Sequence, residues 1–227
     1  MARSKVLIVD WGNTLCASSE SYSKIAREVA AIFTENGIPM STEEYRAASK
    51  ETREELRREM AGNVRRHRFG IHERRIVEKF GKRIGWRLAG KIDRQVFAAY
   101  LSKLRAKKGA KRFLATARKS GAHVILVSNS NYYKLRKEVG KLGFGKYFDE
   151  VICSGKCGYE KSSGVPYRMA MKRALARGWA GRAPDFLVVG DREEEDGAAR
   201  KLGIEVVILD DKPGAFGRVL KKISRHQ

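Results

Sequence analysis

Short runs of consecutive apolar residues are the clearest pattern along the chain, and such runs predict strands buried on both faces of a parallel sheet. The predicted strands are Val6–Val9, Val124–Val127, Phe148–Cys153, Phe186–Val189 and Val206–Leu209. From Gly109 onwards, helical spacing alternates with these strands, at about 113–120, 132–142 and 166–177, and again from about Pro213. This alternation predicts an α/β fold, with a Rossmann-like parallel sheet that has helices on both faces.

The segment between the first two strands has helical periodicity throughout and almost no strand signal. One helix is expected from Ser18 to Asn36–Gly37, and the capping box Ser41-Thr42-Glu43-Glu44 predicts a second that ends near Met60. A third is expected over 71–88, broken near Gly81 or Gly85, and Asp93 is expected to cap a fourth. We therefore expect an inserted helical bundle at residues 18–106, with residues 1–17 and 107–227 forming the α/β domain.

The composition is that of a folded protein outside the membrane. Of 227 residues, 42% are hydrophobic, and no apolar run approaches the roughly 20 residues of a membrane span. The first strand follows Met1–Lys5 directly, so no signal peptide is expected. Cys16, Cys153 and Cys157 have neither zinc-pair nor disulfide-framework spacing. We expect reduced thiols and a cytoplasmic location.

The formal charge is +22, from 48 lysines and arginines against 26 acidic residues. Asparagine and glutamine are scarce, which is typical of thermophilic proteins with many surface ion pairs. Ion-pair networks need acids as well, so they do not explain the imbalance. The surplus predicts attraction to anions, either phosphorylated substrates or, non-specifically, nucleic acid.

Polar residues that could take part in catalysis or metal binding follow three of the predicted strands. Asp10, Ser128 and Asp191 come at strand ends, and the carboxyl ends of parallel strands converge on one crevice. Lys161 lies in a loop near a fourth strand end, and Asp196 follows Asp191 by five positions. Carboxylates gathered this way suit Mg²⁺, which takes few carboxylates together with phosphate and water. For Asp10 alone, the other interpretation is an aspartate that only opens a turn.

Four short motifs, in order along the whole chain, resemble those of the haloacid dehalogenase superfamily. They are Asp10-Trp11-Gly12-Asn13-Thr14-Leu15, Val127-Ser128-Asn129, Lys161 after Gly158-Tyr159-Glu160, and Gly190-Asp191 with Asp196. The helical insertion after the first strand is similar to that family's C1-type cap, which closes over small substrates.

The resemblance implies an enzyme that attacks phosphorus with Asp10 and forms an aspartyl-phosphate. It also implies Mg²⁺ held by Asp10, the Gly12 carbonyl and Asp191, with Asp196 orienting the metal's water or Lys161. Ser128 and Lys161 are the other expected catalytic residues, through their contacts with the phosphoryl group and with Asp10. The substrate side is expected to include Thr14, Asn129 and the backbone amide of Trp11, whose side chain is expected to be structural.

Gly12 is the one departure from the pattern, because most phosphatases of this family have a second aspartate there. The missing general acid and base is usually worth about 10²–10⁴-fold in rate. We therefore expect slow phosphatase activity, or activity limited to good leaving groups such as acyl and aryl phosphates. Glu73 and His72 in the helical segment are candidates to replace the missing acid.

Two alternatives remain at this stage. A 2-haloacid dehalogenase or phosphonatase-like hydrolase needs no second aspartate, and Lys161 followed by Tyr167 is similar to the dehalogenases. Those enzymes, however, have serine at the position of Asp191, and Tyr167 is then expected to be a packing residue.

The second alternative is a catalytically weak member that binds nucleic acid through its basic clusters, which otherwise are solvated helix faces. No aromatic residues are interleaved with these clusters, which are Arg57-Arg58, Arg65–Arg68, Arg74-Arg75, Lys107-Lys108 and Lys111-Arg112. The oligomeric state is not predicted.

Overall fold

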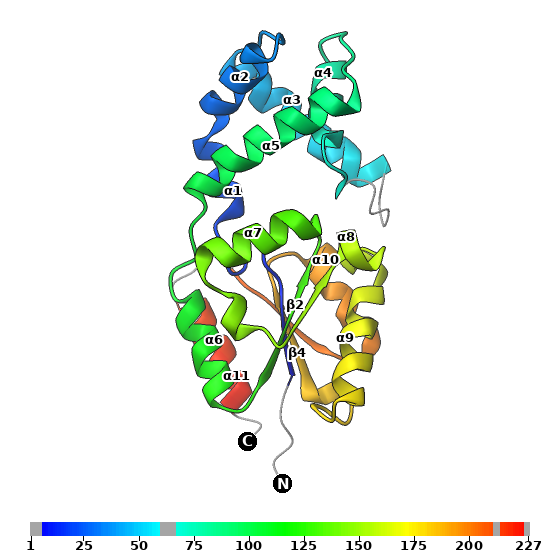
Figure 1. The fold of residues 1–227 in the computed structure, drawn as a ribbon. Helices are drawn as coiled ribbons and strands as arrows, with labels where there is room; N and C mark the ends of the chain where they lie inside the picture. Colours follow the sequence, from blue (N-terminus) through cyan, green and yellow to red (C-terminus); the bar gives the residue numbers. More distant parts are fainter. Residues whose placement is uncertain (1–5, 60–66, 211–213, 225–227) are drawn as a thin grey trace. The chain divides into compact units, whose positions relative to one another are not determined.

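The computed structural model describes residues 6–59, 67–210 and 214–224, and the chain divides into two compact units (Figure 1). The core unit comprises Met1–Ala17 and Arg105–Gln227, and the helical unit comprises Ser18–Leu104. The helical segment expected from the sequence, 18–106, extends two residues further than the helical unit. Among the described helices, none combines the length and apolar character that a membrane crossing requires.

The core unit is built on one parallel sheet of five strands in the order β3-β2-β1-β4-β5. The strands are β1 (Val6–Val9), β2 (His123–Ser128), β3 (Glu150–Cys153), β4 (Phe186–Gly190) and β5 (Glu205–Ile208). In the register of the sheet, Val9 pairs with Leu126 on one side and with Val189 on the other. The central strand therefore ends within two residues of the ends of both neighbours, and the predicted parallel α/β architecture is confirmed.

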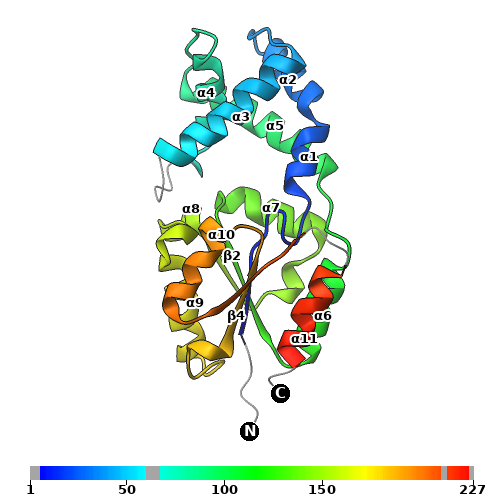
Figure 2. The same ribbon diagram turned by 180° about the vertical axis from the view of Figure 1, so that it is seen from behind.

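Helices cover both faces of this sheet (Figures 1 and 2). On one face, α6 (Ala110–Lys119) packs with α11 (Ala215–Ser224) through the stacked rings of Phe113 and Phe216. On the other face, α9 (Val165–Ala176) places Tyr167, Ala170 and Ala174 against the buried side chains of the strands. All four residues of β1 are at most 1% exposed, as an apolar run between two helical layers requires.

The remaining helices of the core unit connect strands to one another. They are α7 (Tyr132–Leu142), α8 (Ser154–Cys157) and α10 (Glu193–Asp196), with 3₁₀ helices at Gly145–Tyr147, Lys161–Ser163, Ala183–Asp185 and Gly197–Leu202. Asn131 caps α7 as predicted, because its side chain accepts hydrogen bonds from the amides of Tyr133 and Lys134. The expected start of the last helix at Pro213 lies outside the described residues.

The helical unit contains α1 (Ser18–Lys24), α2 (Ala26–Glu35), α3 (Thr42–Glu59), α4 (Ile71–Glu78) and α5 (Trp86–Lys103). The capping box is confirmed: the Glu44 amide donates to Ser41 Oγ at 3.1 Å, and the Ser41 amide donates to Glu44 Oε2 at 2.7 Å. The first expected helix is two helices that meet at Ile25, where φ is −103° and ψ is 4°. Met60, the expected end of the second, lies outside the described residues.

The prediction that Asp93 caps a helix is wrong. Asp93 lies inside α5, which already begins at Trp86, and its buried carboxylate accepts a hydrogen bond from the Gly70 amide at 3.1 Å. Gly70 has a φ of +77°, and a Cβ there would lie 2.8 Å from the backbone of Ala89 and Gly90. Asp93 therefore ties the start of α4 to the middle of α5.

The chain leaves and re-enters the core unit through two paired segments. The Ala17 amide donates to the Arg105 carbonyl, and the Lys107 amide donates to the Leu15 carbonyl, each at 2.9 Å. Between them, Cys16 and Ala106 form an antiparallel bridge. Both connections to the inserted helices therefore start from one short ladder beside the end of β1.

Candidate active site

The edge of the sheet brings together polar residues at the ends of β1, β2 and β4. Asp10 follows β1, Ser128 is the last residue of β2, and Asp191 follows β4. Because these strands are neighbours, residues more than a hundred positions apart in the sequence meet at one place. Asp10 and Ser128 are buried, and Asp191 is partly exposed.

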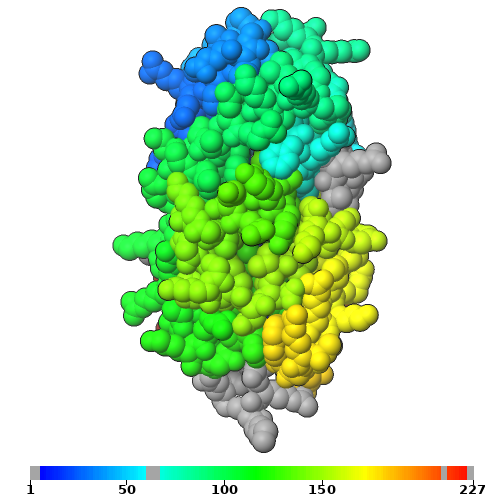
Figure 3. Space-filling model, viewed as in Figure 1, coloured from blue at the N-terminus to red at the C-terminus, as the bar shows by residue number. Residues whose placement is uncertain are grey.

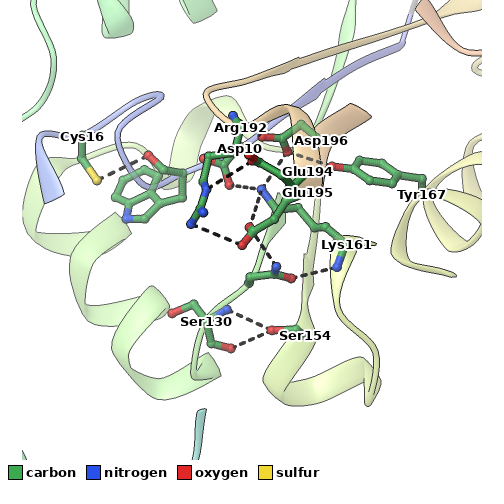
Figure 4. A network of polar contacts seen from close by, with 12 residues as sticks. Asp10, Cys16, Ser130, Ser154, Lys161, Tyr167, Arg192, Glu194, Glu195 and Asp196 are labelled. Atoms are coloured by element: carbon green, nitrogen blue, oxygen red, sulfur yellow. Dashed lines mark hydrogen bonds and ion pairs between the residues drawn. The ribbon is translucent and has the colours of Figure 1, made fainter. Parts of the chain in front are cut away.

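Lys161 is the centre of the network that Figure 4 shows. Its side chain is 2% exposed, and its Nζ lies 2.6 Å from Asp10 Oδ1 and 2.7 Å from Asp196 Oδ1. A third carboxylate oxygen, Glu195 Oε2, lies 3.8 Å away. Burial opposes the charge on this amine, but Asp10 and Asp196 outweigh it and raise the pKa of Lys161 well above its usual value. Lys161 is therefore an ammonium ion at neutral pH.

Asp10, Asp191 and Asp196 each offer a carboxylate oxygen, and these oxygens lie within 4.8 Å of one another. Burial raises the pKa of Asp10; Lys161 lowers it, and Asp196 and Asp191 raise it further. The pKa of Asp191 is also raised, first by burial. Like charges held this close favour a cation among them, and an all-oxygen donor set suits a hard divalent ion. The residues present therefore fit Mg²⁺.

Asp196 is completely buried and is held by three donors. In addition to Lys161, the Tyr167 hydroxyl donates to its Oδ1 at 2.9 Å, and the Arg192 amide donates to its Oδ2 at 3.2 Å. A Cβ at position 190 would overlap the Asp196 carboxylate, so Gly190 is required for this approach. Asp196 therefore accepts a hydrogen bond from the Lys161 ammonium group and fixes its position.

Tyr167 contributes to the site as well as to the core. Its ring packs in the buried cluster beneath the sheet, as expected, and its hydroxyl reaches Asp196. The prediction that Tyr167 is a packing residue therefore describes its ring but not its hydroxyl group. A phenol buried to 1% exposure has to find a hydrogen-bond partner, and here the partner belongs to the site.

Asn129 was expected to contact substrate, but both ends of its amide are engaged by the protein. Its Oδ1 accepts from the Lys161 amide at 2.9 Å, and its Nδ2 donates to Glu195 Oε2 at 2.9 Å. Glu195 also lies 3.5 Å from a guanidinium nitrogen of Arg192. Asn129 thus fastens the loop that carries Lys161 to the segment after β4.

The turn after Asp10 is anchored by Trp11. The Trp11 carbonyl accepts hydrogen bonds from the amides of Leu15 and Cys16, and Asn13 takes a left-handed conformation with a φ of +55°. The Trp11 side chain is 2% exposed and packs edge-on against Phe144 at 5.3 Å between ring centres. The expectation of a structural side chain at Trp11 agrees with this burial.

Thr14 lies in the same turn and is completely buried. Its hydroxyl oxygen has no hydrogen-bond partner among the residues that the structure describes. Cys16 is buried nearby, and all three cysteines are thiols and not parts of disulfides, which agrees with the expectation.

Several residues of the network were not predicted. Glu195 and Arg192 lie in a charged run of which only Asp191 and Asp196 were singled out, although Glu195 shares the helical turn of Asp196. Glu138, whose carboxylate accepts a hydrogen bond from the indole of Trp11, was not predicted either. The sequence feature that could have indicated it is an acidic residue at a buried position of α7. Glu73 and His72, the candidate acids, lie in α4 of the helical unit, where Glu73 is 4% exposed.

The structure is thus a parallel α/β sheet with a buried aspartate after its central strand and a lysine between two carboxylates, at the edge where open α/β sheets bind ligands. The family model described as haloacid dehalogenase-like hydrolase matches residues 4–203. The chain belongs to this family.

Solved structures with the same fold include both phosphatases and dehalogenases. YfnB, a HAD-hydrolase from Bacillus subtilis bound to magnesium, has a TM-score of 0.75 at 15% identity, over 92% of this chain and 91% of that one. A HAD phosphatase from Thermococcus onnurineus has a TM-score of 0.66 at 18% identity, over 92% and 87%. A 2-haloacid dehalogenase from Pseudomonas syringae has a TM-score of 0.67 at 19% identity, over 99% and 100%. No curated protein matches the chain.

Proposed function

We propose that this hydrolase is Mg²⁺-dependent and acts slowly on a small phosphorylated compound through an aspartyl-phosphate on Asp10. The position of Asp191 is the observation that carries the proposal. Its carboxylate lies in the cluster with Asp10 and Asp196, yet it makes no hydrogen bond or ion pair among the described residues. An acidic group at this edge, raised in pKa and without a protein partner, is suited to bind a cation.

Asp10, Asp191 and the Gly12 carbonyl would hold the ion, while Asp196 is engaged by Lys161, Tyr167 and Arg192. When bound, Mg²⁺ neutralises negative charge on the phosphoryl group that is transferred. The relative from Bacillus subtilis is bound to magnesium, which supports this assignment.

The contacts of Asp10 distinguish its two oxygens. Lys161 binds Oδ1 at 2.6 Å, whereas Oδ2 makes no hydrogen bond among the described residues. Oδ2 is therefore the attacking atom: its bond to phosphorus forms while the bond from phosphorus to the leaving oxygen breaks. The leaving group departs with the electron pair of that bond. Lys161 and the Ser128 hydroxyl stabilise the charge on the phosphoryl oxygens.

Gly12 determines which leaving groups are accepted. Position 12 has no side chain to protonate the departing oxygen, so an acyl or aryl phosphate, whose leaving group is stable as an anion, is favoured. The same absence affects the second step, because no side chain at position 12 takes a proton from the water that attacks the aspartyl-phosphate. The phosphorylated enzyme is therefore expected to be long-lived.

A 2-haloacid dehalogenase is the second candidate. The chain of contacts from Asp10 through Lys161 and Asp196 to Tyr167 serves attack on carbon as well, because it needs no metal and no second aspartate. In that reaction Asp10 forms an ester with the substrate carbon and a halide ion leaves. Asp191 speaks against this reaction, because a second carboxylate at the edge has no role in it.

The two candidates are separated by metal dependence. We expect acetyl phosphate and p-nitrophenyl phosphate to be hydrolysed with Mg²⁺ and not in excess EDTA. Chloride release from 2-chloropropionate in EDTA, without phosphate release from either ester in Mg²⁺, would overturn the proposal in favour of the dehalogenase. A silent result for all three substrates with correctly folded protein would overturn both.

A further inference from the structure

Helix α5 and the turn before it carry a row of cations. Arg87, Lys91 and Arg94 are spaced i, i+4 and i+7 in α5, so they follow one another along one face of the helix. Lys82 and Arg83 precede the helix, and all five residues are exposed. We call these five residues the α5 basic stripe. Figure 3 shows the green segment of α5 at the surface of the helical unit.

No acidic side chain among the described residues forms an ion pair with the stripe. Asp93, the one acid of α5, is buried inside the helical unit, where its carboxylate accepts a backbone amide. Glu78 forms its ion pairs with arginines of its own helix, α4. Glu51 and Glu55 of α3 both pair with Lys79. The positive charge of the stripe is therefore directed to solvent.

Helix α3 carries the same residue types at the same spacing, but among acids. Arg46, Lys50 and Arg53 repeat the order of the stripe at i, i+4 and i+7, and all three are exposed. Glu43 precedes Arg46 by three positions and Glu54 follows Lys50 by four, so both acids lie beside these cations. The cations of α3 are thus interspersed with negative charge, whereas those of the stripe are not.

The basic clusters predicted from the sequence include arginines beside the start of α5. The guanidinium groups of Arg68 and Arg74 lie 3.8 and 4.3 Å from the ring centre of Trp86. They therefore compete with a stacked base for this indole. Arg65 and Arg66 lie outside the described residues. The stripe itself was not among the predicted clusters, because its cations are four and three positions apart rather than adjacent.

We propose that the α5 basic stripe binds the phosphate backbone of double-stranded nucleic acid, independently of the activity at the sheet edge. Because a helix rises about 1.5 Å per residue, Arg87 and Arg94 are separated by about 10 Å along the axis. Duplex DNA carries one negative charge per about 1.7 Å of its axis, so several phosphates face a row of this length. Each cation without an acidic partner can neutralise a phosphate and release a condensed counterion.

The composition of the stripe favours a duplex over two other anionic partners. Proteins that bind single strands combine their cations with aromatic rings on which bases stack, and no aromatic side chain belongs to the stripe. Helices that bind membrane surfaces combine cations with an exposed apolar face. The apolar residues of α5, such as Ile92 and Val96, are instead buried inside the helical unit. Contacts with phosphates carry no sequence information, so binding without sequence preference is expected.

The proposal is tested by the salt dependence of binding in the full-length protein. Anisotropy of a fluorescein-labelled DNA duplex of about 20 base pairs gives the slope of log affinity against log salt. Each phosphate contact on B-DNA contributes about 0.9 to this slope, so R87A/K91A/R94A is expected to lower it by about 2.7. Alanine preserves the helix, which circular dichroism checks. R87Q/K91Q/R94Q removes the same charges with longer side chains and is expected to give the same slope.

The matched control is R46A/K50A/R53A. This variant removes the same residue types, the same charge and the same spacing from α3, where Glu43 and Glu54 remain. We expect it to change the slope by less than a third of the change in R87A/K91A/R94A. The readout is binding alone, so its result does not depend on whether the site at the sheet edge is active.

Four results would overturn the proposal. A Kd of the wild type above about 10⁻⁴ M at physiological salt would be weaker than ordinary non-specific DNA binding. An equal loss of slope in R46A/K50A/R53A would show that overall charge causes the attraction. Tighter binding of an oligothymidylate of the same length would identify single strands as the ligand. Displacement of the duplex by phosphatidylserine vesicles that bind R87A/K91A/R94A less tightly would identify a membrane surface.

Discussion

The indole N–H of Trp11 donates a hydrogen bond to the carboxylate of Glu138 at 2.5 Å, joining two residues 127 positions apart. Trp11 directly follows the proposed nucleophile, and Glu138 lies on the inner side of α7, where it is 7% exposed. The indole is the one hydrogen-bond donor to this buried carboxylate among the described residues. The position of the turn after Asp10 therefore depends on an acid that is itself costly to bury.

E138Q is expected to stabilise the protein increasingly as the pH rises. Burial raises the pKa of Glu138 from 4.5 to about 7, although the Trp11 indole and Lys134 lower it. The folded state therefore holds this proton more tightly than the unfolded state, and stability is lost as the pH rises from about 4.5 to about 7. A difference of about 2.5 pH units between the folded and unfolded pKa corresponds to about 3 kcal/mol.

Glutamine does not titrate, and its side-chain oxygen still accepts from the indole. Urea unfolding at pH 5, 6, 7 and 8 is therefore expected to show a difference between E138Q and the wild type that grows with pH. E54Q, which replaces an exposed glutamate on α3, is the control. Parallel pH profiles for E138Q and the wild type would show that folding does not raise the pKa of Glu138.

D10N is expected to abolish turnover and leave the fold intact. The amide lacks the nucleophilic oxygen, so the rate with acetyl phosphate should fall by at least about 10³-fold, as for other enzymes that lose a nucleophile. Circular dichroism and thermal unfolding check the fold, and mass spectrometry excludes deamidation of the new asparagine. Full activity in D10N would refute the assignment of the nucleophile.

G12D is expected to increase phosphatase activity, because it restores a proton donor beside the leaving group. The gain in kcat/KM, which reports formation of the aspartyl-phosphate, should approach about 10²-fold for an alkyl phosphate and be smaller for p-nitrophenyl phosphate, whose leaving group needs no proton. G12N has nearly the same shape without an acid and is the matched control. Equal rates for G12D and G12N would mean that another group already transfers the proton.

Y167F is expected to lower kcat about tenfold and to leave KM nearly unchanged. It removes one of the two donors to Asp196 Oδ1, and leaving a buried charged acceptor less satisfied costs about 1–3 kcal/mol. Y100F is the control, because it removes a buried hydroxyl that donates to Ser18 in the helical unit. A lower melting temperature in Y167F with an unchanged kcat would show that the hydroxyl only stabilises the core.

The sheet could be predicted because its signal is local. A run such as Val6–Val9 is apolar on both faces whatever it packs against, and the residue after it must lie at the edge of the sheet. The same reasoning predicted that Asp10, Ser128, Lys161 and Asp191 belong to one place. The capping box at Ser41 and Glu44 is equally local, since both partners lie within one helical turn.

The partners of buried polar groups could not be predicted in this way. Asp93 has the sequence features of a cap, but its acceptor oxygen is used by Gly70 on another helix. Asn129 follows a strand end as a substrate ligand would, but Lys161 and Glu195 engage its amide. In each case the choice is made between segments distant in the sequence, where burial, rather than periodicity, decides which donor meets which acceptor.

The short ladder at Cys16 and Ala106 has a consequence for which changes in the inserted segment the core unit tolerates. The segment that leads into the inserted helices pairs with the segment that leads out of them, before the chain reaches Ser18. The sheet therefore does not depend on the residues inserted between these two segments. Exchange of the inserted segment for another of different length is therefore expected to leave the five-stranded sheet folded.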